Sequence, residues 1–126
     1  MKALQVIDQA FRTTTEEQDD TILWLTQSMR GAGGHLTVLL SGHAVYYATQ
    51  HQTQPALTIA GWAQTQPANL PRDIGNLLHS GVPVFAVTED LEERGLDRQT
   101  LLDGVQAVSR QGLVNLYESV DQIWQW

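Results

Sequence analysis

Short apolar runs, separated by polar and glycine-rich segments, recur along this chain and predict five β-strands. The second and third runs are apolar at nearly every position, which is typical of parallel strands covered on both faces. Pro83 stands just before the third run, where a residue without an N–H is tolerated. The predicted strands cover residues 2–7, 36–40, 84–87, 105–108 and 122–126.

Apolar residues at helical spacing lie between these runs and predict the helices that connect the strands. The first such helix covers residues 16–29, with Thr15 as its N-cap and three glycines from Gly31 onward as its stop. Further helices are predicted from residue 44, over 71–78, after Thr88, over 97–102 and after Ser109. This order makes a mainly parallel sheet with right-handed crossovers the simplest topology, so we expect a single α/β domain over residues 1–126.

Residues 82–96 form the stretch around which this prediction is organised, because they combine a buried strand, a polar turn and a helix. Thr88 suits the N-cap, and Glu89 and Asp90 suit the positive end of the helix dipole. Arg94 and Gly95 are a typical C-terminal pair. The stretch is therefore one half of a βαβ unit.

Residues 50–69 carry no clear periodicity and predict a long surface connection with a short helix or strand inside it. Pro55 and Pro67 interrupt this segment among Gln and Thr residues. Trp62 is expected to pack down onto the domain, with a role in an interface as the alternative.

Composition removes several classes of function. The net charge is −7 and Lys2 is the only lysine, which disfavours nucleic acid and anionic membranes as partners. The chain has no cysteine, so it can have no disulfide, thiolate metal site or cysteine nucleophile. No apolar run approaches the roughly 20 residues that span a bilayer, and no leader is recognisable, so a cytoplasmic location is expected.

The carboxyl ends of parallel strands are where ligands collect, which singles out two turns. They are Ser41-Gly42-His43 and Thr88-Glu89-Asp90. His43 is either a proton-transfer group or a solvated turn residue, and the two acidic residues are either a carboxylate pair or helix-dipole partners. The backbone amides of these turns offer the alternative of a site for a small anion or metabolite. The four histidines are scattered, so neither a metal nor a cofactor is expected.

The run VFAVTEDLEERGL over residues 84–96 resembles a segment of the DsrE/DsrF/DsrH and TusB/TusC/TusD sulfur-relay superfamily. It is most similar to the DsrH/TusB branch, and residues 39–46 and 121–126 carry a weaker similarity. The resemblance implies a three-layer DsrE-like fold with about five strands. Relay members carry sulfur on a cysteine in the turn after the third strand, and these thiol positions fall on Val87 and Asp90. Because neither residue can hold sulfane sulfur, the resemblance implies a non-catalytic subunit or scaffold.

Large aromatic residues suggest how such a subunit would act. Superfamily members assemble as trimers or hexamers, so the resemblance implies a homo-oligomer or a hetero-oligomer with DsrE/DsrF-like subunits. Aromatic side chains are favoured at interfaces. The candidate interface residues are Tyr46, Tyr47, Trp62, Trp124 and Trp126. For Trp124 and Trp126, a core position and a frayed end remain the alternatives.

Overall fold

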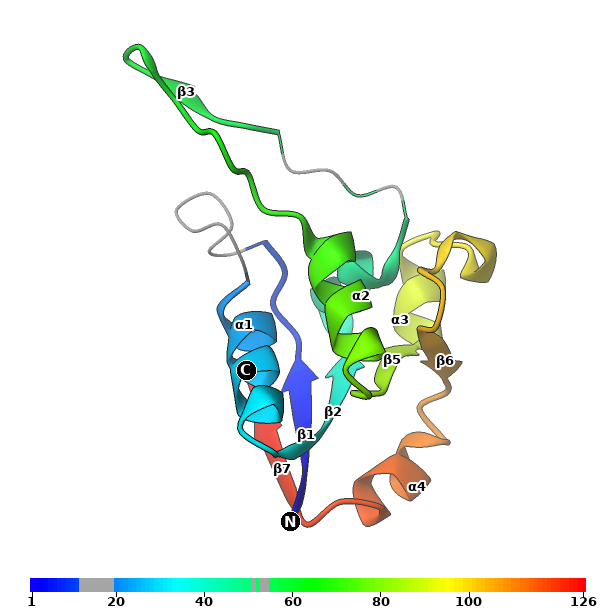
Figure 1. Cartoon of the computed structure of the whole chain (residues 1–126). Helices are drawn as coiled ribbons and strands as arrows, with labels where there is room; N and C mark the ends of the chain where they lie inside the picture. The colour runs from blue at the N-terminus through cyan, green and yellow to red at the C-terminus, as the bar shows by residue number, and fades with distance from the viewer. Residues whose placement is uncertain (12–19, 51, 53–54) are drawn as a thin grey trace.

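The computed structural model describes residues 1–11, 20–50, 52 and 55–126, and it has the predicted α/β architecture (Figure 1). Its main sheet is parallel, with the strand order β6-β5-β2-β1-β7. The strands are β1 (Lys2–Ile7), β2 (His35–Leu40), β5 (Val84–Val87), β6 (Gln106–Val108) and β7 (Gln122–Gln125). Each lies within one residue of a predicted strand, so the strand predictions are confirmed.

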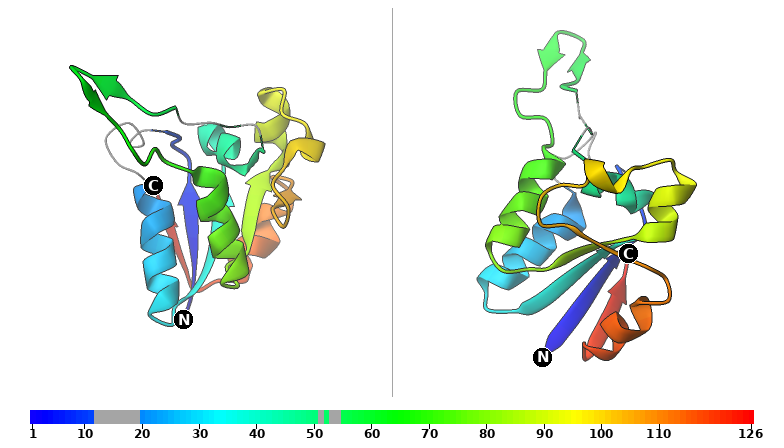
Figure 2. Two further views of the ribbon diagram at one scale, coloured as in Figure 1. Left: turned by 45° about the horizontal axis from the view of Figure 1, so that its top comes forward. Right: turned by 90° about the vertical axis from the view of Figure 1, so that its right-hand side faces the viewer.

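Helices cover both faces of the sheet, which makes three layers (Figure 2). On one face, α1 (Thr21–Gly31), α2 (Leu70–His79) and the 3-10 helix η1 (Gly42–Ala48) pack on the larger core. On the other, α4 (Leu113–Glu118) covers a smaller cluster. Alternate residues of β1 serve the two clusters, Ala3 and Ile7 facing the first and Leu4 and Val6 the second.

The start of the first helix differs from the prediction, whereas one predicted cap further along the chain is confirmed. Asp20 caps α1 by accepting from the N–H groups of Ile22 and Leu23 at 3.0 and 3.2 Å, so this helix begins at Thr21. The predicted cap Thr15 lies outside the described residues. The prediction of Asp97 as a cap is confirmed, because its side chain accepts from Gln99 N–H at the start of η2 (Arg98–Thr100).

Two predicted N-caps are wrong. The N-cap of α3 (Thr88–Glu93) is Val87, because the helix starts directly from the last residue of β5 and leaves no extended residue at Thr88. Gly112 is the N-cap of α4, and Ser109 instead stabilises the preceding turn by accepting from Gly112 N–H at 3.1 Å.

The connection before α2 carries an antiparallel hairpin of β3 (Thr58–Ile59) and β4 (Trp62–Ala63), which stands away from the sheet (Figure 1). Ile59 and Trp62 are register partners across this hairpin. They are 63% and 62% exposed, so the expectation that Trp62 packs onto the domain is wrong. The hairpin places the Trp62 side chain away from the core.

No helix in the described part of the chain has both the length and the apolar character needed to cross a membrane.

Candidate functional site

The carboxyl-terminal edge of the sheet brings together polar residues that follow four different strands. Asp8 follows β1, Ser41 and Gly42 follow β2, Asp90 lies just beyond β5, and Arg110 lies beyond β6. Parallel pairing places these strand ends at one edge, so residues far apart in sequence become neighbours. We refer to these five residues as the carboxyl-edge cluster.

A hydrogen bond joins the two turns that the sequence singles out. The backbone N–H of Gly42 donates to Oδ2 of Asp90 at 2.8 Å. Gly42 has a φ of +54°, which glycine adopts without the strain that a Cβ introduces. Asp90 is buried, at 8% exposure, and Gly42 is half-buried, so this bond is partly protected from water.

The other Asp90 oxygen is held by a cation that sequence reasoning did not select. Nη2 of Arg110 donates to Oδ1 of Asp90 at 2.6 Å and to Oε1 of Glu93 at 3.2 Å. The backbone N–H of Arg110 donates to Oε2 of Glu89 at 2.8 Å, and Arg94 donates to the Asp90 carbonyl oxygen at 3.1 Å. Both carboxylate oxygens of Asp90 are thus engaged.

These contacts determine the ionisation of Asp90. Burial alone raises the pKa of this carboxyl, but the Gly42 hydrogen bond, the Arg110 hydrogen bond and charge, and the Arg94 charge together hold the pKa below its usual value of 3.8. The hydrogen bond to Asp90 correspondingly raises the pKa of Arg110. The pair is therefore ionised near neutral pH.

We expect this pair to make the chain sensitive to acid. Because the pKa of Asp90 is lower in the folded than in the unfolded state, its stabilisation is complete above pH 3.8 and is lost as the pH falls through the folded value. The loss should be small, since the Arg110 side chain is 54% exposed and water screens the pair. Urea unfolding at pH 7 and pH 3 should show a smaller pH effect for Asp90→Asn than for the parent or for the exposed control Glu92→Gln. Equal effects in all three proteins would contradict this expectation.

Ser41 and Asp8 form a second contact in the cluster. The Ser41 hydroxyl donates to Oδ1 of Asp8, and Nε2 of Gln125 donates to Oδ2 of Asp8 at 2.7 Å. The Ser41 hydroxyl is therefore directed to a carboxylate and not to His43. His43 is exposed and its Nδ1 lies 3.4 Å from Nη2 of Arg94. This geometry does not form a nucleophilic serine–histidine pair.

The remaining candidate residues occupy different positions. Thr88 is half-buried and its hydroxyl lies 3.5 Å from Arg98 Nη2. Val87 is buried at the end of β5. Within the described residues, no group of three or more His, Asp or Glu side chains is placed to hold a metal ion.

One interface candidate is corrected by the structure. Tyr47 is completely buried, because η1 turns it into the larger core, where its hydroxyl donates to Oδ2 of Asp20 and accepts from Phe11 N–H, both at 2.6 Å. Tyr46 and Trp124 are half-buried. Trp126 is 40% exposed but is not frayed, since its indole N–H donates to the buried Oε1 of Gln5 at 2.8 Å.

Sequence reasoning missed Asp8, Arg110 and Gln125 as members of this edge, and it missed Trp24, which is 58% exposed on α1. The sequence held a usable signal for Asp8 and Arg110. Asp8 directly follows the predicted strand 2–7, and Arg110 lies two residues beyond the predicted strand 105–108. No sequence signal distinguished Trp24 from a core residue of an amphipathic helix.

Neither a protein-family model nor a curated protein sequence matches the chain. Solved structures do match it along its length. They include the YchN protein from E. coli, with 18% identity, full coverage of both chains and a TM-score of 0.74. MTH1491 from Methanobacterium thermoautotrophicum, a protein of unknown function, has 16% identity over 99% of this chain and 98% of its own, with a TM-score of 0.66.

A third structure, BT1422 from Bacteroides thetaiotaomicron, is also described as a protein of unknown function. It has 15% identity over 98% of this chain and 94% of its own, with a TM-score of 0.67. At these identities the likeness concerns the fold alone.

Proposed function

We propose that the chain is a non-catalytic, DsrH/TusB-like subunit that acts in a cytoplasmic sulfur relay by assembling with other subunits. The observation that carries this proposal concerns Val87 and Asp90, the two positions that match the family's thiols. The side chains at both positions are buried or already engaged in contacts. Val87 is a buried strand residue, and both carboxylate oxygens of Asp90 are engaged by Gly42 and Arg110. Neither side chain can accept a sulfane sulfur, and the ion pair occupies the turn where a relay thiol would stand.

The same contacts disfavour the alternative, an enzyme or a binder of small anions at this edge. The Gly42 N–H that would receive an anion already donates to Asp90. Asp8, Glu89 and Glu93 add negative charge around it, and an incoming anion would be repelled. We therefore retain the assembly role alone.

Exposed apolar side chains support assembly. An isolated two-stranded hairpin is marginally stable in water, yet the β3–β4 hairpin presents Ile59 and Trp62 on adjacent strands to solvent. Burying such side chains against another subunit would remove them from water. The proposed partners are further copies of this chain in a trimer or hexamer, or DsrE/DsrF-like subunits that carry the relay cysteine.

Labelled sulfane sulfur tests both parts of the proposal in one experiment. The chain is incubated with a persulfide donor, alone and with a cysteine-bearing DsrE/DsrF-like subunit, and then passed through gel filtration with light scattering. We expect no label bound to this polypeptide and a mass that is a multiple of 14.0 kDa or that of a mixed complex. Label retained on this chain would contradict its non-catalytic character, and a 14.0 kDa monomer under both conditions would contradict assembly.

In the same experiment, Trp62→Ser tests whether the β3–β4 hairpin forms the contact between subunits. This change should lower the assembled fraction, while Thr58→Ala, an exposed and less apolar position of the same hairpin, should not. Trp126→Ala is a less specific test because it also removes the hydrogen bond to buried Gln5. Unchanged assembly of Trp62→Ser would exclude the hairpin as the contact.

A further inference from the structure

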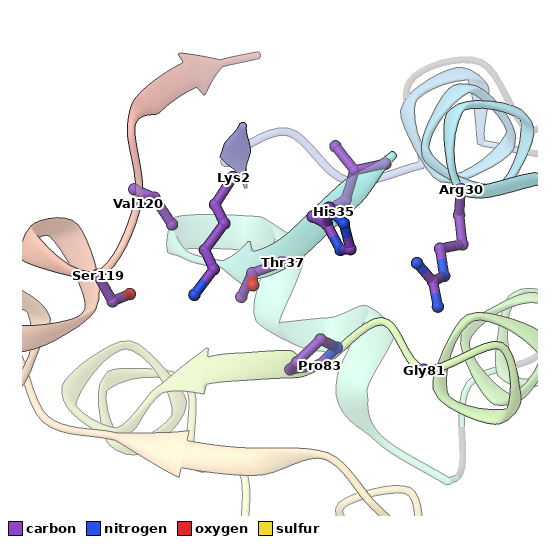
Figure 3. Close-up of a pocket in the computed structure, with 9 residues that line it drawn as sticks. Lys2, Arg30, His35, Thr37, Gly81, Pro83, Ser119 and Val120 are labelled. Carbon is purple, nitrogen blue, oxygen red and sulfur yellow. The ribbon is translucent and has the colours of Figure 1, made fainter. Parts of the chain in front are cut away.

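A pocket of about 290 Å³ at the opposite, amino-terminal edge of the sheet gathers basic side chains (Figure 3). It lies beside the starts of β1 and β2 and the approach to β5. Lys2 and Arg30 enter it from opposite sides, with His35 between them. The sequence places these residues apart, at the start of one strand, the end of α1 and the start of another strand.

The structure holds the Arg30 guanidinium in place without neutralising it. Its Nε donates to the Ser80 carbonyl oxygen at 2.9 Å and its Nη1 to the Gly34 carbonyl oxygen at 3.1 Å. Its Nη2 lies against Gly81 and has no acceptor among the described residues. A half-buried arginine fixed by two carbonyls, with one nitrogen left over, is a preorganised donor for an anionic oxygen.

Lys2 and Thr37 also offer polar groups to the pocket, whereas the Ser119 hydroxyl donates to the Leu116 carbonyl oxygen at 2.6 Å. Within the described part of the chain, the Lys2 ammonium forms no ion pair and the Thr37 hydroxyl has no hydrogen-bond partner. Asp121 is the nearby carboxylate, and it accepts the backbone N–H of Lys2 at 2.8 Å without lining the pocket. Two unpaired cations facing one cavity are unusual in a chain with 14 acidic and 7 basic residues.

We propose that this pocket binds a small doubly charged oxyanion, of the kind presented by a phosphate group. Arg30 would donate from a fixed position, the Lys2 ammonium would supply a mobile charge, and Thr37 would donate a neutral hydrogen bond. Ligand pockets start at about 300 Å³, so a phosphate ion or a small phosphomonoester fits the size. This site lies at the other edge from the carboxyl-edge cluster, so it does not depend on the proposed function.

Calorimetric titration of the protein with inorganic phosphate tests the proposal. The reference is the same titration with sodium chloride at equal ionic strength. Lys2→Met should weaken phosphate binding by about tenfold or more, because it removes a charge-assisted hydrogen bond. Lys2→Arg should retain most of the affinity. The matched control is Arg72→Met, which removes one positive charge from an exposed side chain outside the pocket and should leave the affinity unchanged.

Thr37→Val provides an independent variant that keeps the charge and shape of the pocket. It should weaken binding by about three- to tenfold. Glycerol phosphate in place of inorganic phosphate separates two sources of the ligand: tighter binding of the ester indicates a phosphorylated metabolite, and tighter binding of phosphate indicates the free ion. The proposal is overturned if chloride of equal ionic strength abolishes the signal, or if Lys2→Met and Arg72→Met bind phosphate equally.

Discussion

Tyr47→Ala is expected to lower the free energy of unfolding by about 3–5 kcal/mol, the usual cost of removing a large buried aromatic side chain. Tyr47 is completely buried and packs edge-on against Phe11, with ring centroids 4.9 Å apart. Its hydroxyl also bonds to Asp20, the N-cap of α1, so the same change leaves a buried carboxylate oxygen without this donor. Since folded domains are stable by about 5–15 kcal/mol, the loss is a large part of the total.

Urea unfolding measures this effect, with Tyr46→Ala as the neighbouring control. Tyr46 is half-buried, so its replacement should cost less than half as much. Tyr47→Phe separates the hydroxyl from the ring and should cost about 1.5–3 kcal/mol, because the lost hydrogen bond involves a charged group. If Tyr47→Ala altered assembly and left the unfolding free energy unchanged, Tyr47 would be an interface residue after all.

Asp90→Cys is expected to create a thiol whose pKa lies below the ordinary value of about 8.5. The surroundings of Asp90 already favour an anion, since they hold the pKa of its carboxyl down despite burial. A thiolate at this position would be close to the Gly42 N–H and the Arg110 and Arg94 guanidinium groups, which now contact Asp90.

Thiolate absorbance as a function of pH gives the pKa directly, because the parent chain has no other thiol. The control is Glu92→Cys, which also replaces an acidic residue of α3 but at an exposed position. Circular dichroism confirms that both variants are folded. Equal pKa values for the two thiols would show that the carboxyl-edge cluster does not stabilise an anion other than the native carboxylate.

Most of the fold was predictable because its strands are marked locally. Near-continuous apolar runs such as residues 36–40 can only be buried, and the run at 84–87 is followed at once by acidic residues suited to a helix start. The errors lie at boundaries. Thr88 and Ser109 have the chemistry of N-caps, but which residue takes the extended conformation depends on where the neighbouring strand ends.

The carboxyl-edge cluster was predictable only in part. Gly42 and Asp90 could be selected because each follows an apolar strand, and parallel strands end at the same edge. Arg110 could not be recognised as the partner of Asp90, since its register depends on the pairing of β6 with β5. Exposure was the least predictable property, and Tyr47 and Trp62 show why: an aromatic residue looks the same in the sequence whether its segment turns into the core or stands away from it.

By itself the sequence determined the α/β class, the absence of thiol chemistry and the acidic balance, because these follow from local apolar patterns and from counting residues. Only the tertiary structure decided that Asp90 is neutralised by Arg110, that Tyr47 belongs to the core, and that Lys2 and Arg30 share a pocket. The physical reason is that charge pairing and burial depend on distances between segments remote in sequence, which the packing of sheet and helices sets.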